Sequence, residues 1–571
     1  MMTTTTACAL RAGASVGAVC ALVSLSALCG TPTAAAIEPP SIDPGAVPPD
    51  GPPTPPEEMR QGAYCTRVAT MPDTDYRVQP KYMDMLNLPE AWQFGRGAGV
   101  SVAVIDTGVS PHPRLPNLIG GGDFVVDGGD GLSDCDAHGT WVASLIAAEP
   151  ADGKTPLPPP RETRRPDPVP TTEAPPPPPP PPAPTTIIQQ VPAPAAPPPP
   201  PPEPAPAAYH GDADGPSVQL VSTEVKLAPP GDTDDAPTAP PPAPPPPAGD
   251  VPPADGFSGV APDVTLISIR QSSKAFSPKD AFGEQDPTLR RKAGDISSMA
   301  RGIVHAANMG ATVINISQVS CMSALNIVDQ RELGAAIYYA AVEKDAVIVA
   351  AAGNTANTDC KQNPIYNPLT PNDSRDWAGV STVVTPAWFS DYVLTVGAVD
   401  STGAPLSNMS VAGPWVSIAA PGTDVVSLSP RDDGLINASE GPDNAMVRPE
   451  GTSFSAAIVS GVAALVRAKY PDLTSHQVIN RLIRTAHPPA RGVDNQIGHG
   501  IVDPMAALTY DVPPGEAVAP ARLSTPLLLP PPPAGRDMTP VWVALGGVGA
   551  VALLSGLVVG LAAMARSRSQ Q

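Results

Sequence analysis

Val100-Ser101-Val102-Ala103-Val104-Ile105 is the stretch that decides the fold of this chain, and Asp106-Thr107-Gly108 follows it directly. A short run so rich in valine and isoleucine is typical of a strand buried on both faces of a parallel sheet. Comparable runs recur at Thr265–Ile269, Thr312–Ile316, Ala346–Ala351, Val393–Val396 and Val416–Ile418. Stretches with helical character lie between most of these runs, at Trp141–Ala148, Ser297–Asn308 and Leu333–Lys344. This alternation predicts an α/β fold with a doubly wound, mostly parallel sheet flanked by helices.

Two further stretches are predicted to be helical. Ser455–Ala468 is small and apolar nearly all round, which suits a helix buried inside the core. Met83–Phe94 is expected to form a short helix that leads into the domain, with Gly95–Gly99 as the turn after it. We therefore expect one large folded domain over residues 81–512.

Proline marks the parts of the chain that cannot pack a core. The chain has 82 prolines in 571 residues, well above the usual share of about 5%. They concentrate in an insert at 150–256, a linker at 513–539 and the first part of an N-terminal arm at 37–80. Such sequence favours extended polyproline II. The insert is predicted to be either a flexible tether or a docking element for other proteins.

The charge balance argues against nucleic acid as a partner. The formal net charge is -21, with only 4% aromatic residues, whereas phosphate binding needs clustered Lys and Arg. No histidine or cysteine pair has the spacing of a metal site, so we expect neither metal nor cofactor. The acidic residues Asp127, Asp130 and Asp134 are expected to lie in a solvated loop and not to bind calcium.

The two ends of the chain predict its compartment. Ala12–Leu28 is an apolar run behind Arg11, and Ala34-Ala35-Ala36 follows as a cleavage-like site, so residues 1–36 are predicted to be a signal peptide. A short anchor or core helix is the alternative. Residues 540–564 are uncharged and apolar, which predicts a transmembrane helix. The arginines in the tail at 565–571 place that tail in the cytoplasm and the body outside the cell membrane.

Four cysteines remain after the predicted signal peptide: Cys65, Cys135, Cys321 and Cys360. An even number in an exported protein predicts two disulfides, for which three pairings exist. We expect Cys65–Cys135 and Cys321–Cys360, which would tie the arm beside His138 and close a loop at the predicted cleft. Free buried thiols are the alternative.

Three reactive side chains stand among small residues at the edges of apolar runs: Asp106, His138 and Ser453. A nucleophilic serine needs a base to take its proton, and that base needs a buried carboxylate to hold its tautomer. Each side chain alone has an ordinary explanation, as a strand-end turn, a capping histidine or a helix start. Together, in this order, they predict a catalytic triad. Asn354 is the natural side-chain donor to the oxyanion, which the start of the Ser453 helix would also favour.

At these motifs the chain resembles the subtilisin family of serine proteases, the subtilases, over roughly Leu86–Ala507 apart from the insert. Leu88–Trp92, Gly259–Asp263 and Gly500–Asp503 are also similar to that family. More narrowly, the chain resembles the mycosins, which are membrane-anchored subtilases associated with type VII (ESX) secretion systems. The shared features are the signal peptide, four cysteines, proline-rich linker and single C-terminal membrane helix. The long insert resembles the mycosin subgroup with an extended loop after the catalytic histidine.

The resemblance implies roles for particular residues. It implies Asp106, His138 and Ser453 as the triad and Asn354 as the oxyanion donor. It also implies that the arm at 37–80 wraps the domain and is not a removable inhibitory pro-domain.

One departure from the family lies in the predicted substrate cleft. Subtilisins usually carry a bulky residue and two glycines where this chain has Gln318-Val319-Ser320, directly after Ser317. Side chains in place of glycines should narrow the cleft, which Ala352 and Gly353 would also line. We therefore expect restricted specificity and low activity on generic peptides.

The resemblance implies two functions that can coexist. The first is a single-pass inner-membrane endopeptidase with its protease domain outside the cytoplasm, which cleaves exported proteins or peptides through an acyl-enzyme. The second is a structural subunit that stabilises the secretion complex without needing proteolysis. Both imply other subunits of that complex and the lipid bilayer as partners, and both are compatible with a homo-oligomer.

Overall fold

The computed structural model describes residues 37–151, 255–279, 286–365, 375–490, 492–524 and 538–568. The predicted signal peptide, nearly all of the proline-rich insert, half of the predicted linker and the last residues of the tail lie outside these ranges.

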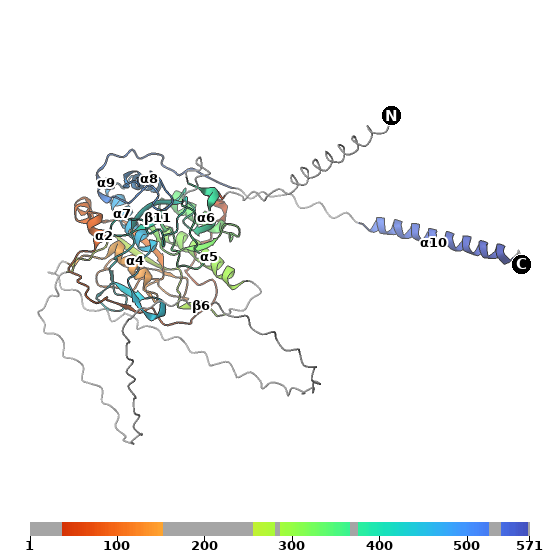
Figure 1. Ribbon diagram of the computed structural model, residues 1–571, viewed down its shortest axis with the longest axis horizontal. Helices are drawn as coiled ribbons and strands as arrows, with labels where there is room; N and C mark the ends of the chain where they lie inside the picture. Colours follow the sequence, from red (N-terminus) through yellow and green to blue (C-terminus); the bar gives the residue numbers. More distant parts are fainter. Residues whose placement is uncertain are drawn as a thin grey trace, which may run out of the picture. The chain divides into compact units, whose positions relative to one another are not determined.

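A seven-stranded sheet forms the centre of the described chain (Figure 1), and all its neighbouring strands run parallel. The strand order is β12-β11-β9-β7-β3-β5-β4. The bounds are β3 Ser101–Asp106, β4 Leu118–Asp123, β5 Thr265–Arg270, β7 Val313–Ile316, β9 Val347–Ala351, β11 Val393–Val399 and β12 Val416–Pro421. After β3 the chain places β4 at the edge of the sheet and β5 between β3 and β4. It then crosses to the other side of β3, where β7 pairs. Such a reversal opens a crevice at the carboxyl ends of the strands, where sites form.

The predicted doubly wound fold is confirmed, and six of the seven strands match predicted runs. The sequence pattern missed β4, Leu118–Asp123, whose Leu-Ile-Gly-Gly-Gly-Asp sequence has three glycines and lacks a continuous apolar run. Glycine is depleted in strands because it offers no side chain to pack. Here Gly121 is needed for close packing, since a Cβ would lie 2.7 Å from Ile267 and Ile269 of β5.

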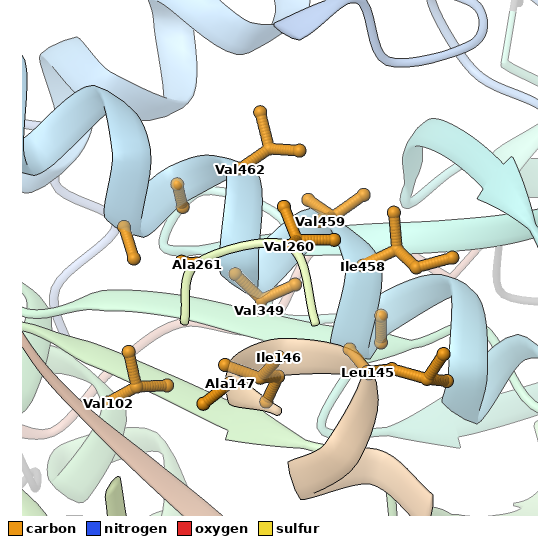
Figure 2. Packing of buried hydrophobic residues seen from close by; sticks show 14 of the residues in the cluster. Val102, Leu145, Ile146, Ala147, Val260, Ala261, Val349, Ile458, Val459 and Val462 are labelled. Atoms are coloured by element: carbon orange, nitrogen blue, oxygen red, sulfur yellow. The ribbon is translucent and has the colours of Figure 1, made fainter. Parts of the chain in front are cut away.

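Helices cover both faces of the sheet (Figure 1). One face packs against α4 His138–Ala147, α7 Thr452–Lys469 and α8 Ser475–Thr485. The other packs against α5 Pro287–Asn308 and α6 Arg331–Tyr338. Side chains alternate across a strand, so in β3 Val102 and Val104 join the first core while Ala103 and Ile105 join the second. Figure 2 shows the first core, with Val102 and Val349 of the sheet beside residues of α4, α7 and the loop carrying Val260 and Ala261.

Three predicted helices differ from the structure at their ends. The predicted helix Met83–Phe94 is divided into α2 Lys81–Met85, α3 Leu88–Ala91 and a 3-10 turn Trp92–Phe94, because Asn87 takes a left-handed φ of 50°. Helix α5 begins ten residues before the predicted start, where the Asp286 carboxylate accepts the Thr288 N–H at 2.8 Å. Helix α6 ends at Tyr338 and continues as a π turn over Tyr339–Glu343.

The N-terminal arm forms strand-like pairs with later parts of the chain in three places. Ile42 bridges to Leu523, β1 Met59–Gln61 pairs with β6 Phe276–Pro278, and β2 Val68–Ala69 pairs with β15 Ala438–Glu440. The remaining short pairs are β8 Ser320–Ser323 with β10 Thr382–Thr385, β13 Ser427–Leu428 with β14 Leu435–Ile436, and β15 with β16 Met446–Val447. Extended arm segments are therefore held by strand pairing, although their sequence lacks strand patterning.

Two more helices complete the described chain. The short helix α9, Pro504–Thr509, begins after Asp503, whose side chain accepts the Ala506 N–H at 2.9 Å. Helix α10 spans Thr539–Arg568. Among the described residues it is the one helix long and apolar enough to cross a membrane, over Val541–Arg566.

Candidate active site

Asp106 and His138 form a hydrogen-bonded pair at the carboxyl edge of the sheet. Asp106 is the last residue of β3 and is fully buried, at 0% exposure. His138 is the first residue of α4, and its Nδ1 lies 2.7 Å from Asp106 Oδ1. Partial burial of the ring opposes its protonation, but the charge of Asp106 and this hydrogen bond outweigh that effect. The pKa of His138 is therefore raised above its usual value.

Ser453 is the second residue of α7 and is 5% exposed. Its hydroxyl donates to the carbonyl oxygen of Ser317 at 3.1 Å, and among the described residues it makes no hydrogen bond to His138. The next residue, Phe454, has its ring centroid 5.8 Å from that of His138. The start of the serine helix therefore lies beside the imidazole.

The segment after β7 joins the serine to the acid–base pair. Ser317 contacts Ser453 twice, because its own hydroxyl also lies 3.0 Å from the Ser453 carbonyl oxygen. Gln318, the next residue, places its side-chain Nε2 3.2 Å from Asp106 Oδ1 and 3.2 Å from His138 Nδ1. Two consecutive residues thus touch all three predicted triad members.

Asn354 follows β9 and is held in one orientation by the start of α7. Its Oδ1 accepts the Thr452 N–H and the Thr452 hydroxyl, both at 3.0 Å. The Thr452 hydroxyl oxygen in turn accepts the Gly353 N–H at 3.1 Å. With Oδ1 occupied, the Nδ2 donor is the end left for another acceptor, and a Cβ on Gly451 would lie only 3.1 Å from it. The glycine before the serine helix therefore leaves room for this donor.

Asp134 corrects an expectation from the sequence, because it is not in a solvated position. It is 2% exposed and accepts hydrogen bonds from the Thr107 hydroxyl at 2.9 Å and from the Thr140 N–H at 2.8 Å and hydroxyl at 2.7 Å. Burial raises its pKa to about 6. This carboxylate ties the turn after Asp106 to the helix that begins at His138. The one sequence signal for it was its position four residues before the histidine.

A model described as the subtilase family matches residues 97–157 and 248–500. The chain belongs to the subtilase family. It is 61% identical to Mycosin-5 of Mycobacterium tuberculosis over 580 residues, which cover 98% of each chain. This similarity over nearly the whole length places it, within the subtilases, among the mycosins.

Solved structures similar to this subtilase include members of secretion assemblies. One chain of an intact ESX-5 inner membrane complex is 57% identical, with a TM-score of 0.68 over 92% of this chain and 100% of that chain. A crystal structure of MycP1 from the ESX-1 type VII secretion system is 40% identical, with a TM-score of 0.65 over 86% of this chain and 100% of that chain.

Both disulfides of this subtilase lie near the site. The structure joins Cys65 to Cys135 and Cys321 to Cys360, the pairing expected from the sequence. Cys135 stands three residues before His138, so the first bond ties the N-terminal arm to the histidine loop. Arg431 adds to this junction by donating to the carbonyl oxygens of Thr66 and Cys135, both at 3.1 Å.

Valine side chains pack closely around Gly353, and two of them, Val384 and Val411, are fully buried. A Cβ placed on Gly353 would lie 3.2 Å from Val384, 3.6 Å from Val411 and 3.7 Å from Val319. Ala352, beside Gly353, is buried. Gly353 therefore packs closely against the apolar core. Within the described ranges, no group of three His, Cys, Asp or Glu side chains is arranged to hold a metal ion.

Proposed function

We propose that this mycosin is a serine endopeptidase in which Asp106, His138 and Ser453 form the triad and Asn354 is the oxyanion donor. The observation that carries the proposal is the 2.7 Å bond from His138 Nδ1 to Asp106 Oδ1, next to a serine at the start of a buried helix. A buried carboxylate on Nδ1 fixes the tautomer that leaves Nε2 free to accept a proton from the serine.

Each residue then has a chemical role. The Ser453 hydroxyl rotates from Ser317 to His138 Nε2 and gives up its proton as Oγ attacks the carbonyl carbon of the substrate. Asn354 Nδ2 and the Ser453 N–H donate hydrogen bonds to the oxyanion. The Ser453 N–H is available because the first N–H groups of a helix have no carbonyl acceptor within the helix. His138 passes its proton to the leaving amine, and water then hydrolyses the acyl-enzyme.

The side chains that follow Ser317 support restricted specificity. Gln318-Val319-Ser320 stands where subtilisins usually carry a bulky residue and two glycines, so we propose that this protease accepts few peptides and cleaves generic ones slowly. Ser317, Gln318, Val319, Ala352 and Gly353 are the residues proposed to line the cleft.

The ends of the chain support a proposed membrane topology. We place a signal peptide at 1–36, the arm at 37–80, the protease domain at 81–512 with its insert at 150–256, a linker at 513–539 and a membrane helix at 540–564. Arg566 and Arg568 follow the apolar part of α10, which favours a cytoplasmic tail at 565–571 and a catalytic domain outside the inner membrane.

Labelling with a fluorophosphonate probe tests the triad. The full-length chain should label covalently, Ser453→Ala should abolish the label, and His138→Ala should slow it severely. Ser401→Ala, on the loop after β11, is the matched control and should label like the parent. Absence of labelling in a folded parent protein would contradict the proposal.

A structural role in the secretion complex is the second candidate. The similarity to a chain of an ESX-5 inner membrane complex over 92% of this sequence favours it. Complementation of a deletion strain separates the two: Ser453→Ala should fail to restore secretion if proteolysis is essential. Normal secretion with Ser453→Ala, together with failure of a chain lacking 540–564, would support the structural role.

A further inference from the structure

Gln318 reaches the acid–base pair from the wall of the cleft. It is the second residue after β7 and is half-buried. Its side-chain Nε2 is 3.2 Å from both Asp106 Oδ1 and His138 Nδ1. The sequence predicts that this residue lines the substrate cleft, and its amide also contacts Asp106 and the Nδ1 edge of His138.

The amide shares one oxygen of Asp106 with the imidazole. Oδ1 receives three donors: the Thr107 N–H at 2.7 Å, His138 Nδ1 at 2.7 Å and Gln318 Nε2 at 3.2 Å. The other oxygen, Oδ2, is buried and has no hydrogen-bond partner among the described residues. An amide N–H is a donor only, so when Nδ1 carries its proton the amide can bond to Asp106 and not to the ring. The glutamine and the histidine therefore compete for the same acceptor.

We propose that Gln318 is a positioning residue, which donates to Asp106 Oδ1, holds the carboxylate in place and weakens its hold on the protonated imidazole. The inference rests on the proposed roles of Asp106 and His138. A donor to a carboxylate stabilises its charge and reduces what that charge offers a second donor. Gln318 thereby keeps the base ready to release its proton to the leaving amine.

Other charged groups near His138 stay constant when Gln318 is changed. Asp106 at the end of β3 and Asp134 in the loop before α4 favour the protonated ring, and Lys274 between β5 and β6 opposes it. Of these, Asp106 is the one that bonds to the ring. A substitution at Gln318 therefore alters one donor to Asp106 and leaves the surrounding charges in place.

The test measures the protonation of His138 directly. The full-length chain with Ser453→Ala, in detergent and with ¹³C-labelled histidine, is titrated by NMR, and His138→Ala identifies the resonance. Gln318→Leu removes the donor and should raise the pKa of His138 by about half a unit, while the isosteric Gln318→Glu adds a charge and should raise it by about one unit. Gln93→Leu, on the exposed turn after α3, should leave it unchanged.

The same variants with Ser453 restored should show the same shifts in the acidic limb of kcat/KM, which reports the free enzyme. An unchanged His138 titration in folded Gln318→Leu and Gln318→Glu would overturn the proposal and leave Gln318 as a cleft wall. A shifted titration in a chain that never labels with fluorophosphonate would keep the positioning role and contradict the proposed protease function instead.

Discussion

Strand ends and helix starts both supply side chains to this site, but they hold them differently. Asp106 ends strand β3 and Asn354 follows β9, and each accepts a backbone N–H, from Thr107 and Thr452 respectively. His138 and Ser453 lie at the starts of helices α4 and α7, and the serine hydroxyl is bonded to a carbonyl oxygen, a bond that the proposed mechanism requires it to break.

The difference matches the chemistry that we propose for each group. A carboxylate and an oxyanion donor act by fixed electrostatics and gain from being immobile. A base and a nucleophile must exchange a proton. Each therefore needs to be held in position while the atom that gives or takes the proton stays free to change its hydrogen-bond partner. The predictions below separate these two kinds of residue, beginning with the largest effect.

The effects of His138 and Ser453, the two residues at helix starts, on kcat should not be additive. Ser453→Ala and His138→Ala should each lower kcat by about 10⁶-fold, and the double variant should lose no more, as in subtilisin. Steady-state kinetics on a peptide cleaved by the parent chain measures all three. Additive losses would mean that the two side chains do not share a proton.

Substitution of Asn354, the proposed oxyanion donor after β9, should lower kcat less than substitution of His138 or Ser453. Asn354→Ala should lower kcat by about 10²- to 10³-fold, the usual effect of removing one oxyanion donor, with little change in KM. Asn326→Ala, at an exposed position in the loop after β8, is the control. A loss that appears in KM instead would indicate a role in ground-state binding.

Substitution of Asp134, which bonds both to the turn after β3 and to the start of α4, should lower activity less than substitution of Asn354. Asp134→Asn replaces one of the two accepting oxygens with an NH2 group, which then faces the donors of either Thr107 or Thr140, so it should shift the start of α4 and lower kcat/KM by about 10- to 100-fold. Asp127→Asn, exposed in the same loop, should have no effect. If Asp134→Asn lowered the melting temperature but left kcat/KM of the folded enzyme unchanged, its role would be structural alone.

The smallest effect concerns the pH at which the base works. The pKa of His138 is raised, and the reaction needs the neutral ring, so kcat/KM should fall as the pH drops through a midpoint above 6.5. In Asp106→Asn the burial remains but the partner charge is gone, so the His138 titration should move below 6.5. NMR titration measures it without requiring activity. If the titration midpoint of His138 in Asp106→Asn stayed above 6.5, a group other than Asp106 would be responsible for the raised pKa.

The sign of this shift also sets a stability trend. A histidine whose pKa is raised by folding contributes stability that is fully present below its unfolded pKa and is lost as the pH rises through the folded pKa. The contribution of His138 should therefore decline from pH 6.5 upward.

Local sequence determined most of the sheet and indicated which groups we propose to react. Runs such as Val100–Ile105 specify buried strands because β-branched side chains pack on both faces of a parallel sheet. The order of Asp106, His138 and Ser453 indicated the subtilase family, whose model matches the chain. These signals lie within a few neighbouring residues, so they can be recognised without knowing the fold.

Tertiary structure alone decided which distant groups meet. The glycine-rich β4 becomes a strand because β5 provides its pairing edge, Asp134 becomes buried because Thr107 and Thr140 enclose it, and Gln318 reaches Asp106 because β7 lies beside β3. Burial and hydrogen-bond partners depend on contacts between residues tens to hundreds of positions apart. Propensity and periodicity describe only near neighbours, so they carry no information about such contacts.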